Sequence, residues 1–543
     1  MSISPRWSNV RSDRGHSFAQ APQANIKRSV FNRSHGLKTA FNSGYLVPIY
    51  ADEVLPGDTF NMRAALFGRL STPIVPIIDN IYLDTFFFFV PYRLIWANFK
   101  KMMGEQDNPG DTISYAAPIF SIVSGDFAPA GKVTTGTLMD YMGIPANVTW
   151  GAQGLSVTSL FARAYNLIWN QWFRDENLQN SVTVDMGDGP DATANYVLLK
   201  RGKRHDYFTS CLPWPQKGTA VSLPLGTTAN IVRNSNAIAA TWFKDNTNTP
   251  AATGAWSLNT AHGLPMAFDS GGSPLTFDPN GTLYADLTNA TAATINALRL
   301  AFQTQALLER DARGGTRYTE IIRSHFGVIS PDARLQRSEY LGGGTTPINI
   351  APIPQTSATG ATGTVQGNLA AMGTLAATGH GFVKSFTEHG VLLGLASVRA
   401  DLTYQQGVEK MFTRSTRYDW YWPSFAQIGE QPVYNKEIYA IGTTANDAGV
   451  FGYQERYGEY RYKPSKVTGI LNSNAASTLD NWHLAQKFTS LPTLGDTFIK
   501  ETPPIDRVVA VNTEPQIILD AHFNLTCARP MPVQGVPYSL ARL

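Results

Sequence analysis

Apolar and polar residues alternate with a period of two near both ends of the chain. In the segment 59–66, every second residue is apolar, and the same alternation runs through the segment 517–527. This period is typical of a strand with one buried and one exposed face. The expected inward-facing residues are Phe60, Met62, Ala64, Leu66, Ile517, Leu519, Ala521, Phe523, Leu525 and Cys527.

A different pattern marks the segment Thr85–Val90, which is continuously apolar and holds four consecutive phenylalanines. A short run of this kind fits a strand that is buried on both faces, between the sheet and another layer. Asp84 and Pro91 bound it. The segment Val391–Val398 predicts a further strand.

Helical patterns are fewer. Apolar residues recur at helical spacing from Phe161 to Trp172, and a second helix opens at Ile295 and is expected to end at Gly314-Gly315. Arg93–Met103 predicts a short helix closed by Gly104. Strands at both ends with helices and loops between them favour a β-sandwich with enlarged connections.

Two long segments lack either pattern. Gly226–Ala290 holds six charged residues in 65 and several aromatic residues, so we expect a small ordered surface insertion. Leu341–Val383 holds no charged residue and no aromatic residue before Phe382. Its small polar residues predict a surface loop that is either disordered or clamped along a neighbour.

Composition narrows the class of protein. Hydrophobic residues make up 43% of the 543 residues, which is enough for a large core, while 46 glycines and 33 prolines favour a loop-rich β fold. The net charge of +3 means that any nucleic-acid contact must come from local clusters. Cys211 and Cys527 lie far apart with no zinc-finger spacing, so both are expected to be structural thiols. We read no secretory signal and no membrane span.

No catalytic signature is present. Glu388-His389 and the pair Asp520 and His522 bring ionisable groups together, and the latter two would share one face of a strand. A polar outward face explains them better than a metal or acid–base site. We therefore expect no enzyme, no catalytic residue, no bound metal and no cofactor.

Basic residues cluster at two places. Residues 1–36 carry six lysines and arginines against one acid, and the run 200–205 is followed by Tyr207 and Phe208. Cations beside aromatic rings suit single-stranded nucleic acid, although a solvated loop or a salt-bridge patch between subunits is an equal alternative for both clusters. The candidate nucleic-acid-binding residues are Arg6, Arg11, Arg14, Lys27, Arg28, Lys200, Arg201, Lys203, Arg204 and His205.

The segment Leu307–Gly344 is rich in arginine, with six arginines within 28 residues, alternating with acids. Arginine suits planar contacts with carboxylates, phosphates and neighbouring chains. The alternation with acids favours an interface between subunits over a nucleic-acid contact. The candidate interface residues are Arg310, Arg313, Arg317, Arg323, Arg334 and Arg337.

Several long strings resemble the major capsid proteins of gokushoviruses, small single-stranded DNA bacteriophages of the Microviridae. They include SHGLKTAFNSGYLVPIYADEVLPGDTF, FFVPYRLIW, RGKRHDYFTSCLPWPQKG and ARPMPVQGVP, in the family's order and from both ends and the middle of the chain. The resemblance implies an eight-stranded antiparallel jelly roll, which periodicity alone does not select. The segments 226–289 and 342–381 do not match the family at residue level.

The resemblance also implies a function and partners. It implies a virion protein, assembled in the cytoplasm of the host bacterium into a T=1 icosahedral shell around a circular single-stranded DNA genome. The implied partners are further copies of the chain, an internal scaffolding protein, a small basic DNA-binding protein, a pilot protein and a host cell-surface receptor. The rival hypotheses are a jelly-roll lectin or glycosidase and a nucleic-acid-binding module.

The expected organisation has four parts. A basic arm spans 1–36, the jelly-roll core spans 37–225 and 291–543, and a surface insertion spans 226–290. In related capsids an insertion at this place projects outward, so we expect a protrusion near the threefold axes that serves host attachment. The candidate protrusion residues are Trp242, Trp256 and Phe268.

Overall fold

The computed structural model describes residues 27–122, 133–148, 154–221, 295–357 and 366–534, together with the backbone of short strands between 230 and 286. The chain divides into two compact units, which are described separately below. One unit is Gln216–Arg313, and the other comprises Met1–Pro215 and Gly314–Leu543.

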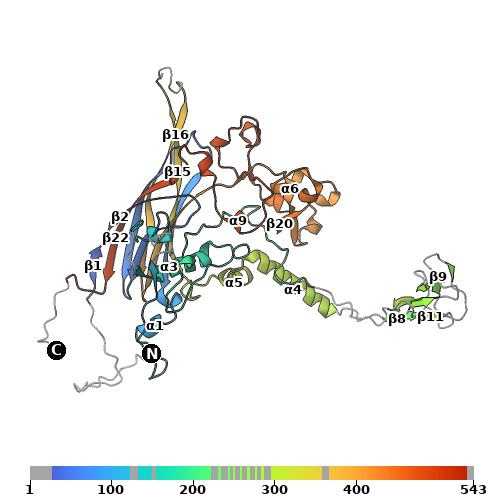
Figure 1. Ribbon diagram of the computed structural model, residues 1–543, viewed down its shortest axis with the longest axis horizontal. Coiled ribbons are helices and arrows are strands. Elements are labelled where there is room, and N and C mark those ends of the chain that lie inside the picture. The colour runs from blue at the N-terminus through green and yellow to red at the C-terminus, as the bar shows by residue number, and fades with distance from the viewer. Residues whose placement is uncertain are drawn as a thin grey trace, which may run out of the picture. The chain divides into compact units, whose positions relative to one another are not determined.

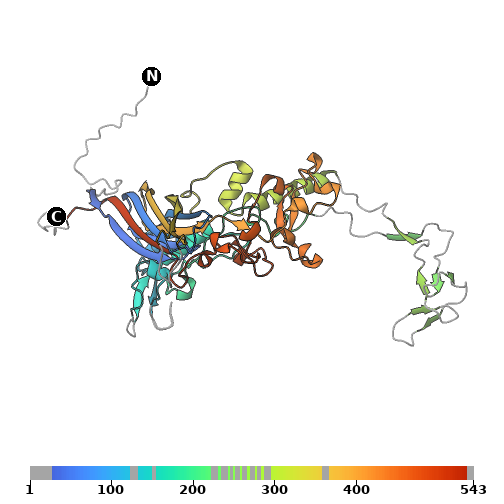
Figure 2. The same ribbon diagram turned by 90° about the horizontal axis from the view of Figure 1, so that it is seen from above.

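The larger unit is built on one curled antiparallel sheet (Figure 1, Figure 2). β1 and β2 pair with β22 in a single register, with Ser29 opposite Arg529 and His35 opposite Phe523, so they form one interrupted strand. Taken as one strand, they open a path of eight strands whose connections are those of a jelly roll, as expected. The path is β1 (Ser29–Asn32) and β2 (His35–Phe41), β22 (Ile517–Arg529), β4 (Thr59–Leu70), β16 (Leu369–Ser385), β15 (Glu339–Pro354), β5 (Ile81–Pro91), β17 (Gly390–Ala400) and β3 (Val47–Val54).

The strands with a period of two behave as predicted. Buried and exposed residues alternate along β4 and, in β22, from Ile517 to Cys527, and the two strands are hydrogen-bonded neighbours. Their inward residues join one hydrophobic core cluster, to which Cys527 belongs. The buried thiol expected there is confirmed, and Cys211 is buried as well.

The phenylalanine run lies in β5, between β15 and β17. Phe87 and Phe89 enter the core cluster that β4 and β22 share, whereas Phe88 and Val90 enter a second cluster formed with the helix α3 (Leu160–Ile168). Burial on both faces is therefore confirmed, with Phe86 only half-buried. The predicted strand over Val391–Val398 is confirmed as β17.

The helix predictions need one correction. α3 continues into a π-helical turn, Trp169–Phe173, and α4 (Ile295–Gly314) ends where the glycines predicted. The helix expected over Arg93–Met103 is instead a 3₁₀ turn, Tyr92–Leu94, followed by α1 (Phe99–Met102). The backbone N–H of Ala97 donates to the carbonyl of Met186, so this N–H cannot form the hydrogen bond that a continuous helix would require.

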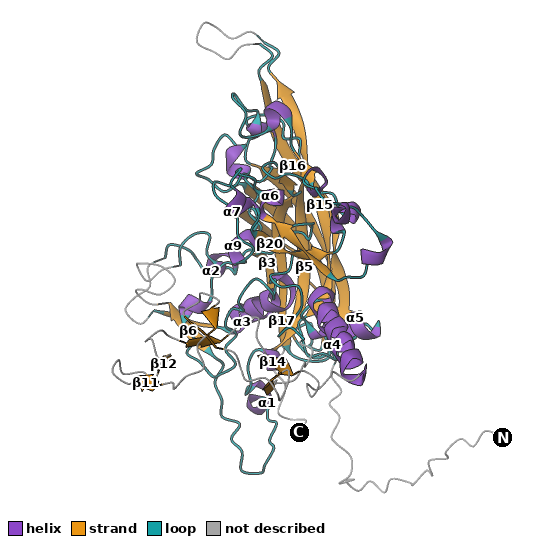
Figure 3. Ribbon diagram, turned by 90° about the vertical axis from the view of Figure 1, so that its right-hand side faces the viewer, coloured by secondary structure: helices purple, strands orange, loops and turns teal. Residues whose placement is uncertain are grey.

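The prediction of a surface loop over Leu341–Val383 is wrong. The segment forms most of β15 and β16, the two longest strands of the sheet, and both run past the ends of the other strands (Figure 1, Figure 3). Glycines replace the usual apolar alternation because backbones approach closely here. A Cβ on Gly343 would lie 2.0 Å from the carbonyl oxygen of Thr85, and one on Gly381 equally close to that of Met62.

Shorter elements complete the larger unit. A third core cluster lies around Tyr207, Phe208 and the strand pair β19 and β20. None of the helices in the described ranges is long and apolar enough to cross a membrane. The remaining elements are α2 (Leu138–Tyr141), α5 (Tyr318–Phe326), α6 (Asn435–Ile438), α7 (Thr444–Asp447), α8 (Gly458–Arg461), α9 (Asp496–Ile499), β6 (Ile119–Ile122), β7 (Leu155–Thr158), β18 (Thr403–Tyr404), β19 (Glu430–Tyr434), β20 (Val450–Glu455) and β21 (Ser465–Lys466).

The smaller unit contains seven short strands and most of α4. The strands pair in three small antiparallel groups: β8 with β14, β9 with β10 and β13, and β11 with β12. Their bounds are β8 (Asn230–Arg233), β9 (Trp242–Lys244), β10 (Thr249–Pro250), β11 (Ser257–Asn259), β12 (Met266–Phe268), β13 (Leu275–Phe277) and β14 (Leu283–Asp286).

Candidate subunit and nucleic-acid interfaces

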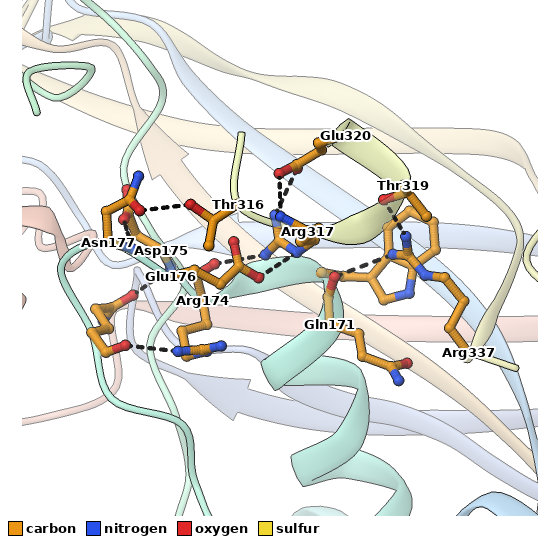
Figure 4. Close-up of polar contacts among 12 residues, drawn as sticks. Gln171, Arg174, Asp175, Glu176, Asn177, Thr316, Arg317, Thr319, Glu320 and Arg337 are labelled. Carbon is orange, nitrogen blue, oxygen red and sulfur yellow. Dashed lines mark hydrogen bonds and ion pairs between the residues drawn. The ribbon is translucent and has the colours of Figure 1, made fainter. Parts of the chain in front are cut away.

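Arg317 connects the start of α5 to the loop that follows the π-helical turn Trp169–Phe173 (Figure 4). Its guanidinium forms an ion pair with Glu176 at 2.6 Å, donates to Glu320 at 3.0 Å, and donates to the backbone carbonyl of Arg174 at 2.7 Å. Glu320 in turn accepts from the backbone N–H of Arg317, which satisfies a free donor at the helix N-terminus. The helix ends at Gly327, whose φ of 69° suits a glycine cap.

The charge balance in this cluster is set by burial. Burial raises the pKa of Glu176, Arg317 opposes this, and the like charge of Glu320 adds to it, so that the pKa lies at about 7. The Glu176 carboxylate therefore depends on Arg317 to remain ionised near neutral pH. This cluster stabilises the fold of one subunit and leaves little of Arg317 for a neighbour.

Arg337 is held in the same way. Its guanidinium lies 4.0 Å from the ring centre of Trp172, donates to Thr319 at 3.2 Å and to the carbonyl of Gln171 at 3.1 Å, and pairs with Asp332 at 3.5 Å. Stacking on an aromatic face and several directed bonds are contacts that arginine makes and lysine cannot. Arg337 therefore holds its loop against the π-helical turn Trp169–Phe173 (Figure 4).

Other members of the arginine run remain exposed. Arg323 on α5 and Arg334 in the following loop are exposed, and between them lie three exposed apolar residues, Phe326 (77%), Val328 (55%) and Ile329 (77%). We call these five residues the α5 surface. Exposed aromatic and aliphatic side chains beside arginine are typical of a protein interface. In the smaller unit Arg310 is exposed and Arg313 is half-buried.

The basic cluster after residue 199 is engaged within the subunit. Arg201 pairs with Asp84 at 2.6 Å, and the same buried carboxylate pairs with Arg399 at 2.7 Å and accepts from Thr345 at 2.6 Å. The Arg201 guanidinium also lies 5.3 Å from the ring centre of Phe86. Arg201 thus pairs with a buried acid of the sheet, and because its side chain is only 13% exposed, little of it is accessible to a phosphate.

The rest of the cluster divides into engaged and exposed residues. Lys203 is only 7% exposed, and burial lowers its pKa while nearby Glu501 raises it. Arg204 pairs with Asp401 at 3.1 Å. Lys200 is half-buried and donates to Thr502, and His205 is exposed. A nucleic-acid role for these residues stays a prediction, and the geometry favours Lys200 and His205 for it.

The arm and the insertion fall largely outside the described residues. Arg6, Arg11, Arg14 and Trp256 lie outside them. Trp242 lies in β9 and Phe268 in β12, where only the backbone is described. Lys27 and Arg28 are both exposed, and Arg28 donates to the hydroxyl of Thr59 at 2.8 Å.

The weak catalytic candidates have structural partners. Glu388 pairs with Arg93 at 2.6 Å, and exposed Asp520 lies 3.6 Å from Lys38 on the outward face of β22. Within the described ranges, no group of His, Cys, Asp and Glu side chains is arranged to hold a metal ion.

One exposed feature was missed from the sequence. Tyr418, Trp420, Tyr421 and Trp422 are between 41% and 58% exposed on a loop whose shape is fixed by Asp419, which accepts from the backbone of Thr416. Four aromatic residues within five positions, with no apolar alternation around them, were the available signal. Ordered aromatic rings at the surface mark a second candidate interface.

A jelly roll with a large hydrophobic core and with exposed aromatic and arginine-bearing surfaces is an architecture found in viral coat proteins. The sequence profile of the family described as "Capsid protein (F protein)" matches residues 19–539, so the chain belongs to this family. The chain is 50% identical to "Capsid protein VP1" of Bdellovibrio phage phiMH2K over 535 residues, covering 97% of this chain and 98% of the relative. It is 41% identical to the protein of the same name of Chlamydia phage 1 and 38% identical to that of Spiroplasma virus 4, in each case covering 96% of this chain and 97% of the relative.

The resemblance to gokushovirus capsid proteins is thereby confirmed. The protein is a major capsid protein, a structural component of the virion that assembles into a multimeric shell.

Proposed function

We propose that the protein forms a closed T=1 icosahedral shell, one subunit per asymmetric unit, around a circular single-stranded DNA genome. The observation that carries the interface part of this proposal is the α5 surface. Arg317 and Arg337 are engaged within the subunit, whereas Arg323 and Arg334 flank exposed Phe326 and Ile329. We propose that this surface contacts a neighbouring subunit, and that Arg310 and Arg313 of the smaller unit make a separate contact between subunits.

Charge reversal tests the interface. Arg323→Glu combined with Arg334→Glu should leave the subunit folded, because both side chains are exposed, and should abolish particles in electron micrographs and gradients. Arg63→Glu is the matched control, because Arg63 is an exposed residue of β4. Particles of normal yield from the double variant would remove the α5 surface from the interface. Particles whose symmetry is not T=1 would refute the proposed lattice.

We propose that DNA is contacted by basic residues of the 1–36 arm together with Lys200 and His205. Single-stranded nucleic acid is bound by positive charge that follows its phosphates, so the contact should weaken with salt. Reversal of Lys27 and Arg28 should reduce packaged DNA per particle while the particles still form. Unchanged DNA content, measured by the ratio of absorbance at 260 and 280 nm, would contradict this role.

We propose that the insertion 226–290 forms an outer protrusion used for host attachment. Its aromatic residues in a sequence with few charges support burial between copies. Replacing 226–290 by a Gly/Ser linker should leave a folded subunit, because long surface insertions are weakly coupled to a core. Particles that lack the insertion and still adsorb normally to host cells would place attachment elsewhere. An internal scaffolding protein, a small basic DNA-binding protein, a pilot protein and a host receptor are the proposed partners, with assembly in the host cytoplasm.

A further inference from the structure

The ends of β15 and β16 leave the sheet together as a two-stranded ribbon. Residues 349–354 of β15 pair with 369–374 of β16. The remainder of β15 pairs with β5 only as far as Ile348, and β16 pairs with β4 only from Thr374 onward. Among the described residues, no third strand extends along either side of this ribbon, which projects past the sheet (Figure 1, Figure 3).

The two edges of the ribbon differ. Gln355 donates its backbone N–H to Asn368, which fixes the alternation of hydrogen-bonded pairs and turns the N–H positions of residues 350, 352 and 354 outward. Pro352 and Pro354 occupy two of these three positions and have no N–H to offer. Proline at such positions prevents the addition of another strand along β15. Another chain can therefore bind a face of the ribbon more readily than it can pair with the β15 edge.

One face of the ribbon is apolar and exposed. Ile353 lies opposite Ala370 and Ala351 opposite Met372, so the four side chains point to the same side. Ile353 is 48% exposed and Met372 is 44% exposed. The segment 341–383 holds no Asp, Glu, Lys or Arg, although 16% of the whole chain is charged. The charges that normally protect a projecting strand pair from association are absent from this segment.

A two-stranded ribbon with an exposed apolar face is marginally stable by itself in water. A covering surface would remove the apolar face from water and explain why no charge protects it. Because the family assembles into a shell, each subunit meets further copies of the same chain. We infer that the ribbon is a docking arm whose Ala351, Ile353, Ala370 and Met372 face packs on a second copy of the chain. This inference rests on the proposed shell.

Protection of an introduced thiol from chemical labelling tests the docking arm without disturbing assembly. The two natural cysteines are buried, at 3% and 0% exposure, so Met372→Cys adds a thiol with little background. We expect maleimide to label Met372→Cys in dissociated subunits at least about tenfold faster than in particles, because labelling in particles would require local opening of the contact. Val450→Cys, at a site of 47% exposure away from the ribbon, controls for general access of the reagent.

The particles for this test are assembled from the full chain together with the proposed internal scaffolding protein. Equal labelling of Met372→Cys in subunits and particles would overturn the inference, as would protection that disappears when nuclease removes nucleic acid. Ile353→Glu gives an independent readout. It should leave subunit folding unchanged and abolish particles, and particles at the wild-type yield would also overturn the inference. If the unmodified chain forms no particles in the same preparation with the scaffolding protein, the proposed shell itself fails, which is a different result.

Discussion

Removing Arg317 should destabilise the subunit, although the side chain belongs to a run that we interpret as an interface. Its guanidinium forms ion pairs with Glu176 and Glu320 and donates a hydrogen bond to the carbonyl of Arg174. Breaking a fully buried pair by removing one partner costs about 3–5 kcal/mol. The side chains of Arg317 and Glu176 are 21% and 13% exposed, so water compensates part of the loss. We expect about 2–3 kcal/mol for Arg317→Ala, reduced from the fully buried value.

Urea unfolding of dissociated subunits, followed by tryptophan fluorescence, measures this loss as a lower midpoint. Arg323→Ala is the matched control, because Arg323 is an exposed arginine of the same helix and should change stability by no more than about 0.5 kcal/mol. The double variant Arg317→Met with Glu176→Gln should recover about 1–2 kcal/mol relative to the additive expectation, since no buried charge is left unpaired. Equal midpoints for Arg317→Ala and Arg323→Ala would refute the distinction between engaged and available arginines.

Three further predictions concern the core, pH and the basic cluster. Phe87→Ala should cost about 3–5 kcal/mol in urea unfolding because the ring is fully buried, whereas half-exposed Phe67→Ala should cost far less, and equal effects would contradict the burial of Phe87. Because the folded-state pKa of Glu176 is raised to about 7, its favourable contribution is complete below its ordinary value of 4.5 and is lost as pH rises through 7. The melting temperature of Glu176→Gln relative to wild type should therefore rise from pH 4.5 to 7.5, and a constant difference would refute the raised pKa. Arg201→Glu should reduce soluble folded subunit, because it places a second acid beside buried Asp84, and normal subunit yield with lower DNA content would instead support a direct DNA role.

Sequence reasoning succeeded where burial alone decides the residue type. The alternation in β4 and β22 and the phenylalanines of β5 have no other stable placement, so their strands were predictable. It failed for 341–383, where small residues are required by close backbone approach at Gly343 and Gly381 rather than by burial of large side chains. A strand built from such small residues has the same composition as a loop, and only the positions of the neighbouring strands distinguish a strand from a loop here.

The candidate interfaces could likewise be predicted only in part from the sequence. The arginine run was found from its composition, but composition does not separate Arg317 from Arg323, because the acids that engage Arg317 include Glu176, distant in sequence. Arg201 was similarly grouped with free cations although its partner Asp84 is 117 residues away. Charge neutralisation by distant residues is a property of the fold, and a local reading of the sequence cannot detect it.

The place of β22 in the sheet has a consequence for the order of events during translation. β22 lies between β2 and β4, two of the earliest strands, but it is synthesised after every other strand of the sheet. A ribosome must therefore release nearly 450 residues beyond β4 before the gap beside that strand can be filled. Contacts of such long range slow folding and leave strand edges open in the meantime. A prematurely terminated chain would lack an inner strand of the sheet, so we expect the topology of the subunit itself to keep incomplete products out of the shell.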